Sequence, residues 1–212
     1  MLAHCSVLAL ATWAGTGLAA PPRAGKPRQL ILVVGDSLSA EYGLPRGSGW
    51  VALLEAKLAR EKIAATVVNA SISGDTTSGG RSRLPALLAQ LKPDVVVIEL
   101  GGNDALRGLP LSMTQDNLTA MVRAAKSAGA RVVVVGMQVP PNYGRKYGDD
   151  FAALFAGVAG AEGTALVPFL LKGVADAPDA EALFQPDRIH PRAEAHPRIL
   201  DNVWPVLRPL LK

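Results

Sequence analysis

The 212-residue chain has one cysteine, Cys5, and only 5% aromatic residues. Cys5 lies in an N-terminal segment that we expect to be removed, so we predict a mature protein without a disulfide, a thiolate nucleophile or a cysteine metal site. With 49% hydrophobic residues, the core should consist of Val, Leu, Ile and Ala. The catalytic or binding chemistry must therefore come from other side chains.

Several functional motifs are also missing. Without a Walker A sequence, a G-x-G-x-x-G loop or an H-E-x-x-H pair, we expect no cofactor and no metal. No G-x-S-x-G surrounds a serine, which excludes the nucleophile elbow of the α/β-hydrolase fold. The net charge is +4, but Lys and Arg are scattered and no aromatics interleave with them, so we expect no nucleic-acid partner. A glycosidase pair of Asp36 and Asp187 stays open, with nothing in its favour.

The first 20 residues have the composition of an export signal. An apolar stretch begins at 7–11, and the small residues 17–20 precede Pro21 and Pro22, although no basic residue comes first. The stretch is too short and too interrupted to span a bilayer, so we expect no stable membrane insertion. We predict a signal peptide at 1–20, a leader at 21–28, a hydrolase domain at 29–212, and a periplasmic or secreted protein.

Five apolar, β-branched runs alternate with helical stretches. The runs predict strands at 30–34, 65–69, 95–100, 132–137 and 165–169, and helices at 50–62, 80–91, 114–128, 151–162 and 193–211. Continuously apolar strands are typical of a parallel sheet that is covered on both faces. We therefore predict a single α/β domain, a three-layer α/β/α sandwich.

A serine follows the first predicted strand, and polar segments follow the next two. Ser37 lies in Gly-Asp-Ser-Leu-Ser directly after 30–34, while Gly74 and Asn103 come after the second and third strands. The carboxyl ends of parallel strands form the ligand crevice of such a sheet. We therefore expect these three residues to meet, with Ser37 as a candidate nucleophile.

A serine nucleophile needs a base, and a carboxylate must orient that base. Outside the signal segment the candidate bases are His190 and His196. Asp187 precedes His190 by three residues, so both can face the same side of a helical turn or a tight loop. His196 has only Glu194 nearby, and we favour His190.

An acyl-transfer site also needs donors for an oxyanion. The backbone N–H groups of Ser37 and Gly74 and the side-chain amide of Asn103 are suitable donors, because glycine lets the chain approach a ligand closely. We expect Asp36 and Asp104 to anchor loops. Each motif alone also occurs as a turn or a helix cap, but their occurrence behind separate strands together favours a serine hydrolase.

Four segments carry a family resemblance: Gly-Asp-Ser-Leu-Ser-Ala at 35–40, Asn-Ala-Ser-Ile-Ser-Gly-Asp-Thr at 69–76, Glu-Leu-Gly-Gly-Asn-Asp-Ala-Leu-Arg-Gly at 99–108, and Asp-Arg-Ile-His-Pro at 187–191. With them the chain resembles the GDSL, or SGNH, hydrolase family, in its bacterial thioesterase I/lysophospholipase/arylesterase branch. Residues 141–147 resemble the segment that follows the fourth strand in that branch. The resemblance runs from about Leu30 to the C-terminus.

The resemblance implies a five-stranded parallel sheet of flavodoxin-like order. It implies Ser37 as the nucleophile, His190 as the base and Asp187 as its partner, with Ser37, Gly74 and Asn103 as the oxyanion hole. It also points to Asn142 and Tyr143 as substrate-binding residues. The chain departs from the family pattern at two places that bear on substrate specificity. Glu41 replaces an expected glycine, and residues 172–185 match little of the family sequence.

We therefore predict an exported serine acyl hydrolase that cleaves medium to long acyl esters or thioesters, including lysophospholipids, through an acyl-serine intermediate. Residues 74–80 and 106–111, with Leu109, are expected to form a wall for the acyl chain. A carbohydrate or peptidoglycan O-acetylesterase and a non-catalytic exported binding domain stay open as alternatives. An FMN binder on the same sheet is disfavoured by Glu41 and Leu44 in the loop that would have to cradle phosphate.

Overall fold

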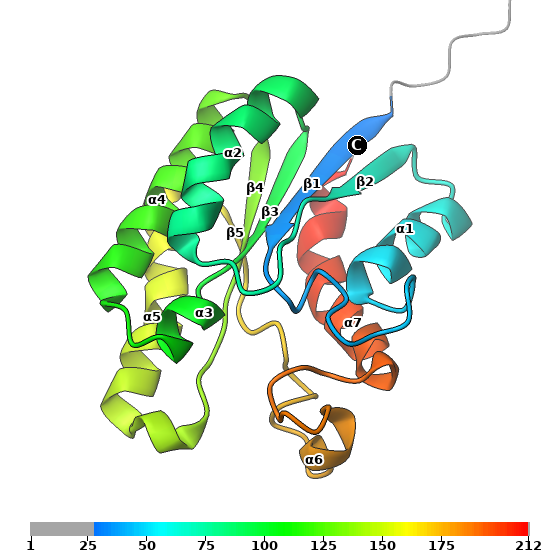
Figure 1. Ribbon diagram of the computed structural model, residues 1–212. Coiled ribbons are helices and arrows are strands. Elements are labelled where there is room, and N and C mark those ends of the chain that lie inside the picture. The colour runs from blue at the N-terminus through cyan, green and yellow to red at the C-terminus, as the bar shows by residue number, and fades with distance from the viewer. Residues whose placement is uncertain (1–27, 212) are drawn as a thin grey trace, which may run out of the picture.

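A five-stranded parallel sheet forms the centre of the computed structural model, which describes residues 28–211 (Figure 1). The strands are β1 (Gln29–Gly35), β2 (Ala65–Asn69), β3 (Val95–Glu99), β4 (Arg131–Val135) and β5 (Ala165–Val167). They are hydrogen-bonded in the order β2-β1-β3-β4-β5, and every neighbouring pair is parallel. The predicted flavodoxin-like sheet is confirmed.

Helices cover both faces of the sheet. On one face α1 (Trp50–Arg60) packs against α7 (His196–Leu207); on the other, α4 (Leu111–Ser127) packs against α2 (Thr77–Leu91) and α5 (Arg145–Glu162) (Figure 1). The short helices α3 (Gly102–Leu106) and α6 (Ala180–Leu183) lie near the carboxyl ends of the strands. The predicted three-layer sandwich is confirmed.

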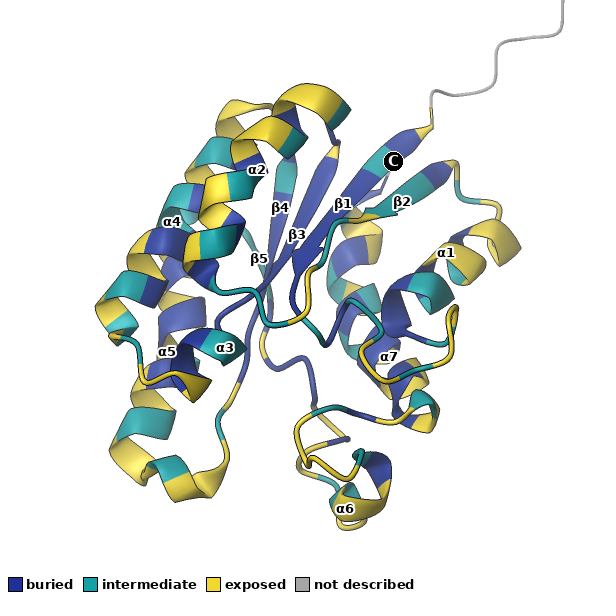
Figure 2. Cartoon of the chain, in the orientation of Figure 1, coloured by how far each residue is buried: buried dark blue, intermediate teal, exposed yellow. Residues whose placement is uncertain are grey.

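The core lies on both sides of the central strands (Figure 2). All five residues of β3 are fully buried, which explains why its first four residues are all apolar instead of alternating with polar ones. Its last residue, Glu99, is the polar exception. The largest side chains of the core are Trp50, Phe151 and Phe155, all on helices. Because the sheet is rigid and buried, the loops at its carboxyl edge start from fixed positions.

Several predicted boundaries were wrong. Helices α2 and α5 begin three and six residues earlier than predicted, so Thr77 to Gly80 form the first turn of α2 rather than part of a loop. The predicted helix 193–211 divides into a 3-10 turn, α7 and a second 3-10 turn, Arg208–Leu210. A helix tolerates proline in its first turn, but further along the proline removes a backbone hydrogen bond. Pro209 lies in the second 3-10 turn, beyond the end of α7.

The predicted signal peptide and most of the leader, residues 1–27, lie outside the described residues. Between residues 28 and 211, no helix combines the length and the apolar character that a bilayer crossing requires. The domain boundaries at 20 and 28 therefore stay predictions.

Candidate active site

The candidate site lies at the carboxyl edge of the sheet, where loops from three neighbouring strands meet. Ser37 follows β1, Gly74 follows β2, and Asn103 lies in α3 just after β3. Because β1 is hydrogen-bonded to both β2 and β3, these loops are neighbours in space although they are far apart in the sequence. The fourth segment, around His190, reaches the same edge from the stretch before α7.

His190 contacts both other members of the predicted triad. Its Nε2 lies 2.9 Å from Ser37 Oγ, and its Nδ1 lies 2.7 Å from Asp187 Oδ2. The imidazole is largely buried, with 15% of its side chain exposed. The structure thus brings together residues 37 and 190, which lie 153 positions apart in the sequence. A base bonded in this way to a hydroxyl and a carboxylate is the arrangement that nucleophilic catalysis requires.

A tight turn holds Asp187 and His190 on the same side. Arg188 takes a left-handed conformation, with φ +58°, which reverses the chain between them. Asp187 Oδ1 accepts the backbone N–H groups of Ile189 and His190, each at 3.0 Å. Burial raises the pKa of Asp187, but these N–H groups and the His190 side chain outweigh it and lower the pKa to about 2. The carboxylate therefore stays ionised and fixed.

The histidine loop is fastened to the loop of the nucleophile. Gln185 donates from Nε2 to the carbonyl of Tyr42 at 2.9 Å, and its own N–H binds the carbonyl of His190 at 2.8 Å. The Tyr42 ring lies 4.3 Å from the His190 ring, centroid to centroid. These contacts set the distance between base and nucleophile. Sequence reasoning missed both residues, because neither belongs to a motif.

The predicted oxyanion donors face the same edge. Within residues 28–211 the backbone N–H groups of Ser37 and Gly74 donate no hydrogen bond, so both are available to a ligand. Gly74 has φ +79° and Gly101 has φ +123°, conformations that favour glycine and let each loop turn at its strand end. Asn103 donates one Nδ2 hydrogen to Asp36 Oδ2 at 3.0 Å, which leaves the other hydrogen for a ligand.

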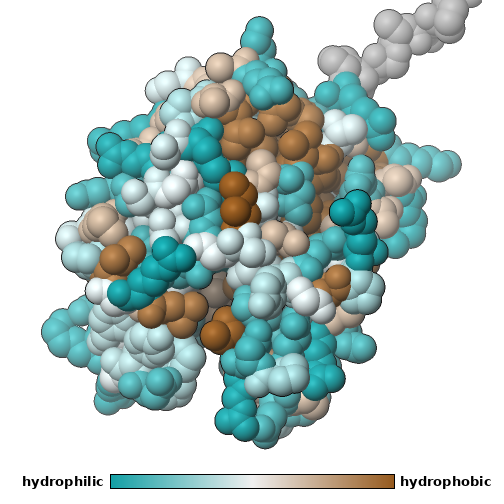
Figure 3. All heavy atoms as spheres, viewed as in Figure 1, coloured by the Kyte–Doolittle hydropathy of each residue, from teal (hydrophilic) through white to brown (hydrophobic). Residues whose placement is uncertain are grey.

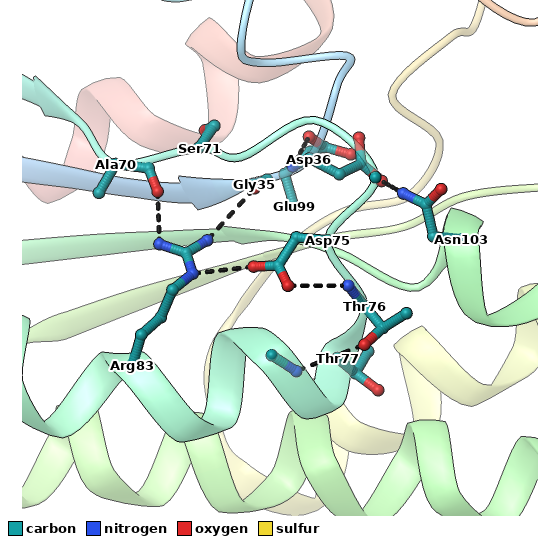
Figure 4. Close-up of polar contacts among 12 residues, drawn as sticks. Gly35, Asp36, Ala70, Ser71, Asp75, Thr76, Thr77, Arg83, Glu99 and Asn103 are labelled. Atoms are coloured by element: carbon teal, nitrogen blue, oxygen red, sulfur yellow. Dashed lines mark hydrogen bonds and ion pairs between the residues drawn. The ribbon is translucent and has the colours of Figure 1, made fainter.

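Arg83 from α2 clamps the loop that carries Gly74 (Figure 4). Its guanidinium donates to the carboxylate of Asp75 at 2.8 Å, to the carbonyl of Ala70, and to the carbonyl of Gly35 at 3.3 Å. The clamp thus joins both sides of Gly74 to the end of β1, two residues before Ser37. Arginine suits this position because its planar fork has five donors. Arg83 belongs to no motif, so sequence reasoning missed its role.

Asp36 and Asp104 anchor loops, as predicted. Asp36 Oδ1 accepts the N–H of Leu38 at 3.0 Å, and burial raises the pKa of Asp36 to about 6 although this N–H, His190 and Asn103 lower it. Asp104 accepts the N–H of Thr77 at 2.9 Å and the hydroxyls of Thr77 and Thr114. Asp104 therefore ties α3 to the start of α2, next to the Gly74 loop.

The predicted substrate-binding residues lie further out. Leu109 is half-buried after α3, Asn142 is exposed and Tyr143 is half-buried in the 3-10 turn before α5. No hydrogen bond, ion pair or ring contact between residues 28 and 211 joins them to Ser37 or His190. A cavity of about 340 Å³ lies beside the same turn, lined by residues between Gln138 and Ala152. Figure 3 shows the surface hollowed between the side over α5 and the side over α6.

His196 and Glu41 have structural roles. The buried His196 accepts the N–H of Trp50 at Nδ1, at 3.0 Å, and so caps the start of α1; burial lowers its pKa, although Glu41 opposes this. Glu41 has φ +58°, which explains why glycine suits that position. Its carboxylate turns toward the N–H groups of Gly47 and Gly49. In the part of the chain that the structure describes, no group of three or more His, Cys, Asp or Glu could hold a metal ion.

Comparison with known proteins identifies the family. Residues 33–198 match the GDSL-like lipase/acylhydrolase family. The chain belongs to this family. It is 54% identical to esterase TesA of Pseudomonas aeruginosa over 86% of this chain and 90% of that protein, and 40% identical to thioesterase 1/protease 1/lysophospholipase L1 of Escherichia coli over 85% and 84%. The crystal structure of the psychrotrophic esterase EstA from Pseudoalteromonas sp., inhibited by monoethylphosphonate, superposes with a TM-score of 0.80 at 39% identity, over 85% of this chain and 97% of that one.

Membership of the GDSL-like family confirms the predicted resemblance, and the predicted class of enzyme, an ester hydrolase, is confirmed with it. The four sequence segments that suggested the family at 35–40, 69–76, 99–108 and 187–191 all fall within the matched range. They are the same segments that supply the groups at the carboxyl edge of the sheet. The family match and the geometry of the site thus concern the same residues.

Proposed function

We propose that the protein hydrolyses acyl esters and thioesters through an acyl-serine intermediate, with Ser37 as the nucleophile, His190 as the base and Asp187 as its orienting carboxylate. The single observation that carries this proposal is the continuous contact from Asp187 through His190 to Ser37, with separations of 2.7 and 2.9 Å. Both distances lie in the range of hydrogen bonds through which protons move.

In the first half-reaction, Ser37 Oγ attacks the acyl carbon while His190 Nε2 takes its proton. Asp187 holds the Nδ1 proton and stabilises the imidazolium that forms. The intermediate then collapses, and the alcohol or thiol leaves with the proton that His190 returns. The protein keeps the acyl group as an ester of Ser37.

The negative oxygen of the intermediate is stabilised by three donors: the N–H groups of Ser37 and Gly74 and the amide of Asn103. Loss of one such donor costs about 3 to 4 kcal/mol of barrier in related sites. In the second half-reaction water replaces the serine: His190 takes a proton from water, the hydroxide attacks the acyl carbon, and Ser37 leaves as the protonated hydroxyl.

Apolar side chains around the site support acyl substrates of some length. In the described part of the chain, four large hydrophobic side chains are exposed, and each lies within five residues of a proposed site residue: Tyr42, Ile72, Leu106 and Ile189. Exposed apolar side chains on the same loops as polar site residues favour a ligand with a polar bond and an apolar tail. The relatives named as an esterase and as a thioesterase/lysophospholipase support the same substrate class, with lysophospholipids included.

A substrate panel on purified residues 21–212 tests the function. We expect hydrolysis of nitrophenyl esters, acyl-CoA and lysophosphatidylcholine, with longer acyl chains preferred over acetyl, and loss of all three activities in Ser37→Ala. An acetylated sugar serves as the comparison substrate. Turnover of that sugar with none of the acyl substrates would contradict the proposal and favour the O-acetylesterase alternative.

We further propose that the chain is exported, with cleavage before Pro21. The apolar stretch and small residues of 1–20 support export. Expression in a bacterial host followed by fractionation and N-terminal sequencing tests it: the released protein should start at Pro21. Recovery of the whole protein in the cytoplasm with Met1 intact would contradict it.

A further inference from the structure

Glu99, the last residue of β3, lies fully buried beneath the loop of Ser37. Its Oε2 accepts the Ser39 hydroxyl at 2.7 Å and the Asp36 N–H at 3.3 Å (Figure 4 shows Glu99 beside Asp36). The two donors stand on either side of Ser37. One buried carboxyl group therefore holds both flanks of the nucleophile, although the proposed mechanism assigns it no step.

The close fit of Glu99 explains a glycine of the family segment. A Cβ on Gly35 would lie 2.7 Å from Glu99 Oε2 and 2.8 Å from Ser39 Oγ, closer than real Cβ atoms approach. Gly35 does not have a positive φ, so backbone conformation does not require glycine here. Ser39 Oγ also accepts the Trp50 Nε1–H at 3.1 Å, which connects the cluster to α1.

Among residues 28–211, no cation forms an ion pair with this carboxyl group, and the guanidinium of Arg83 binds the nearby carbonyl of Gly35 instead. The neighbours of Glu99 are Asp36 and Ser39 after β1 and, through Ser39, the indole N–H of Trp50 on α1 and the amide of Asn69 on β2, which binds the Ser39 carbonyl. Among residues 28–211 no Lys, Arg or His pairs with Glu99, and its Oε1 has no hydrogen-bond partner. An ionised carboxylate in such a place would be costly, because buried charge needs a partner.

Asp36 is the better place for negative charge. It is also buried, but each of its oxygens accepts an N–H group, one from Leu38 and one from Asn103. His190 attracts its charge, while Asp75 repels it. Burial, and then the charge of Asp36, raise the pKa of Glu99 well above its usual range.

We propose that Glu99 is a positioning residue that holds the nucleophile loop as a neutral carboxylic acid, while Asp36 carries the single negative charge of the pair. The charge on Asp36 then orients the Asn103 amide, and the uncharged Glu99 holds Asp36 and Ser39 in place without repelling that charge. The effect on catalysis rests on the proposed function; the state of protonation does not.

Thermal unfolding of Glu99→Gln against the unchanged protein tests the state of protonation without any activity. In the unfolded chain a glutamic acid ionises above its ordinary pKa of about 4.5, whereas a neutral Glu99 in the folded protein keeps its proton. The free energy of unfolding therefore falls increasingly as the pH rises above that value. Glutamine does not titrate. We therefore expect the Tm of Glu99→Gln, minus that of the unchanged protein, to increase steadily from about pH 5 to about pH 8.

Glu55→Gln is the matched control, because Glu55 is exposed on α1 and the same carboxyl group is replaced by the same amide. Its Tm difference should stay nearly constant over that range. A Tm difference for Glu99→Gln that stays level or falls with rising pH would show that Glu99 is ionised in the fold, and would overturn the proposal.

Steady-state kinetics on a nitrophenyl ester tests the positioning role. Glu99→Gln keeps a neutral group of the same shape, so kcat should stay within about threefold; Glu99→Ala leaves Ser39 and Asp36 unsupported and should lower kcat about 100-fold with little change in KM. A Gln variant as poor as the Ala variant would overturn the proposal. If the proposed function is wrong, the protein without any substitution should be inactive on the ester. The Tm difference of Glu99→Gln should still increase with pH.

Discussion

At the scale of single residues, environment separates the two histidines of the described chain. One ring nitrogen of His190 contacts the carboxylate of Asp187 and the other contacts the hydroxyl of Ser37, whereas His196 is buried and accepts the first N–H of α1. The sequence predicted this division from one spacing, the Asp187 three residues before His190. Nothing in the sequence indicated the helix-capping role of His196, because its partner is 146 residues away.

Replacement of His196 by Ala should reduce stability and leave the chemistry largely intact. The Trp50 N–H would lose its acceptor inside the fold, which costs about 1 to 3 kcal/mol. We expect that loss in urea unfolding, and kcat/KM on a nitrophenyl ester within about threefold at 25 °C. A loss of activity as large as that of His190→Ala, with stability unchanged, would reverse the two roles.

Replacement of Asp187 by Asn should keep the turn and remove the charge. The amide cannot hold the protonated Nδ1 of His190 in the correct tautomer, so kcat should fall by about 10⁴-fold with KM nearly unchanged. Steady-state kinetics measures it. Asp201→Asn, at an exposed position of α7, is the control and should match the unchanged enzyme. An Asp187→Asn variant with more than a tenth of the original kcat would contradict the role given to the carboxylate.

At the scale of elements, the sequence predicted helices and strands with a regular hydrophobic pattern. It did not predict very short helices or helix starts that depend on a capping side chain. The β2 strand was predicted with its observed bounds, because an apolar, β-branched run leaves little ambiguity. The predicted start of α2 was wrong, because the observed start depends on a cap in which the Thr76 side chain accepts the N–H of Gly79. The five-residue α3 and the four-residue α6 were missed because they are too short to show a period.

The clamp from α2 to the Gly74 loop should affect the oxyanion more than substrate binding. In Arg83→Met the apolar stem remains but the bonds to Asp75, Ala70 and Gly35 are lost, so Gly74 is held less firmly relative to Ser37. We expect kcat to fall about 10- to 100-fold with KM within about threefold. Arg123→Met, which removes an equivalent arginine paired with Glu162 away from the site, should leave kcat unchanged. Equal losses in both variants would refute the clamp.

The loop after α3 should influence chain length. In Leu109→Asp a charge replaces a half-buried apolar side chain of the predicted acyl wall. We expect kcat/KM for a dodecanoyl ester to fall at least about tenfold more than for an acetyl ester, because only the longer chain would reach this position. A nitrophenyl ester series measures it. Equal losses on both esters would remove Leu109 from the acyl site.

At the scale of the whole molecule, the sheet converts distant sequence segments into one site. The strand order β2-β1-β3 places the ends of three strands side by side, and the chain that returns before α7 adds the histidine. That order could not be derived from composition; the family resemblance implied it. The residues that hold the site in place, such as Gln185, Arg83 and Glu99, could not be predicted, because their contacts exist only after the layers have packed.

The most direct test of the account is the site at which a fluorophosphonate probe attaches. The reagent forms a stable phosphonyl ester with an activated serine hydroxyl, which mimics the tetrahedral intermediate. Digestion and mass spectrometry of the labelled protein should place one adduct on Ser37, and Ser37→Ala and His190→Ala should not be labelled. An adduct on another residue, or labelling that persists in Ser37→Ala, would contradict the claim that this fold joins Ser37 and His190 into one catalytic unit.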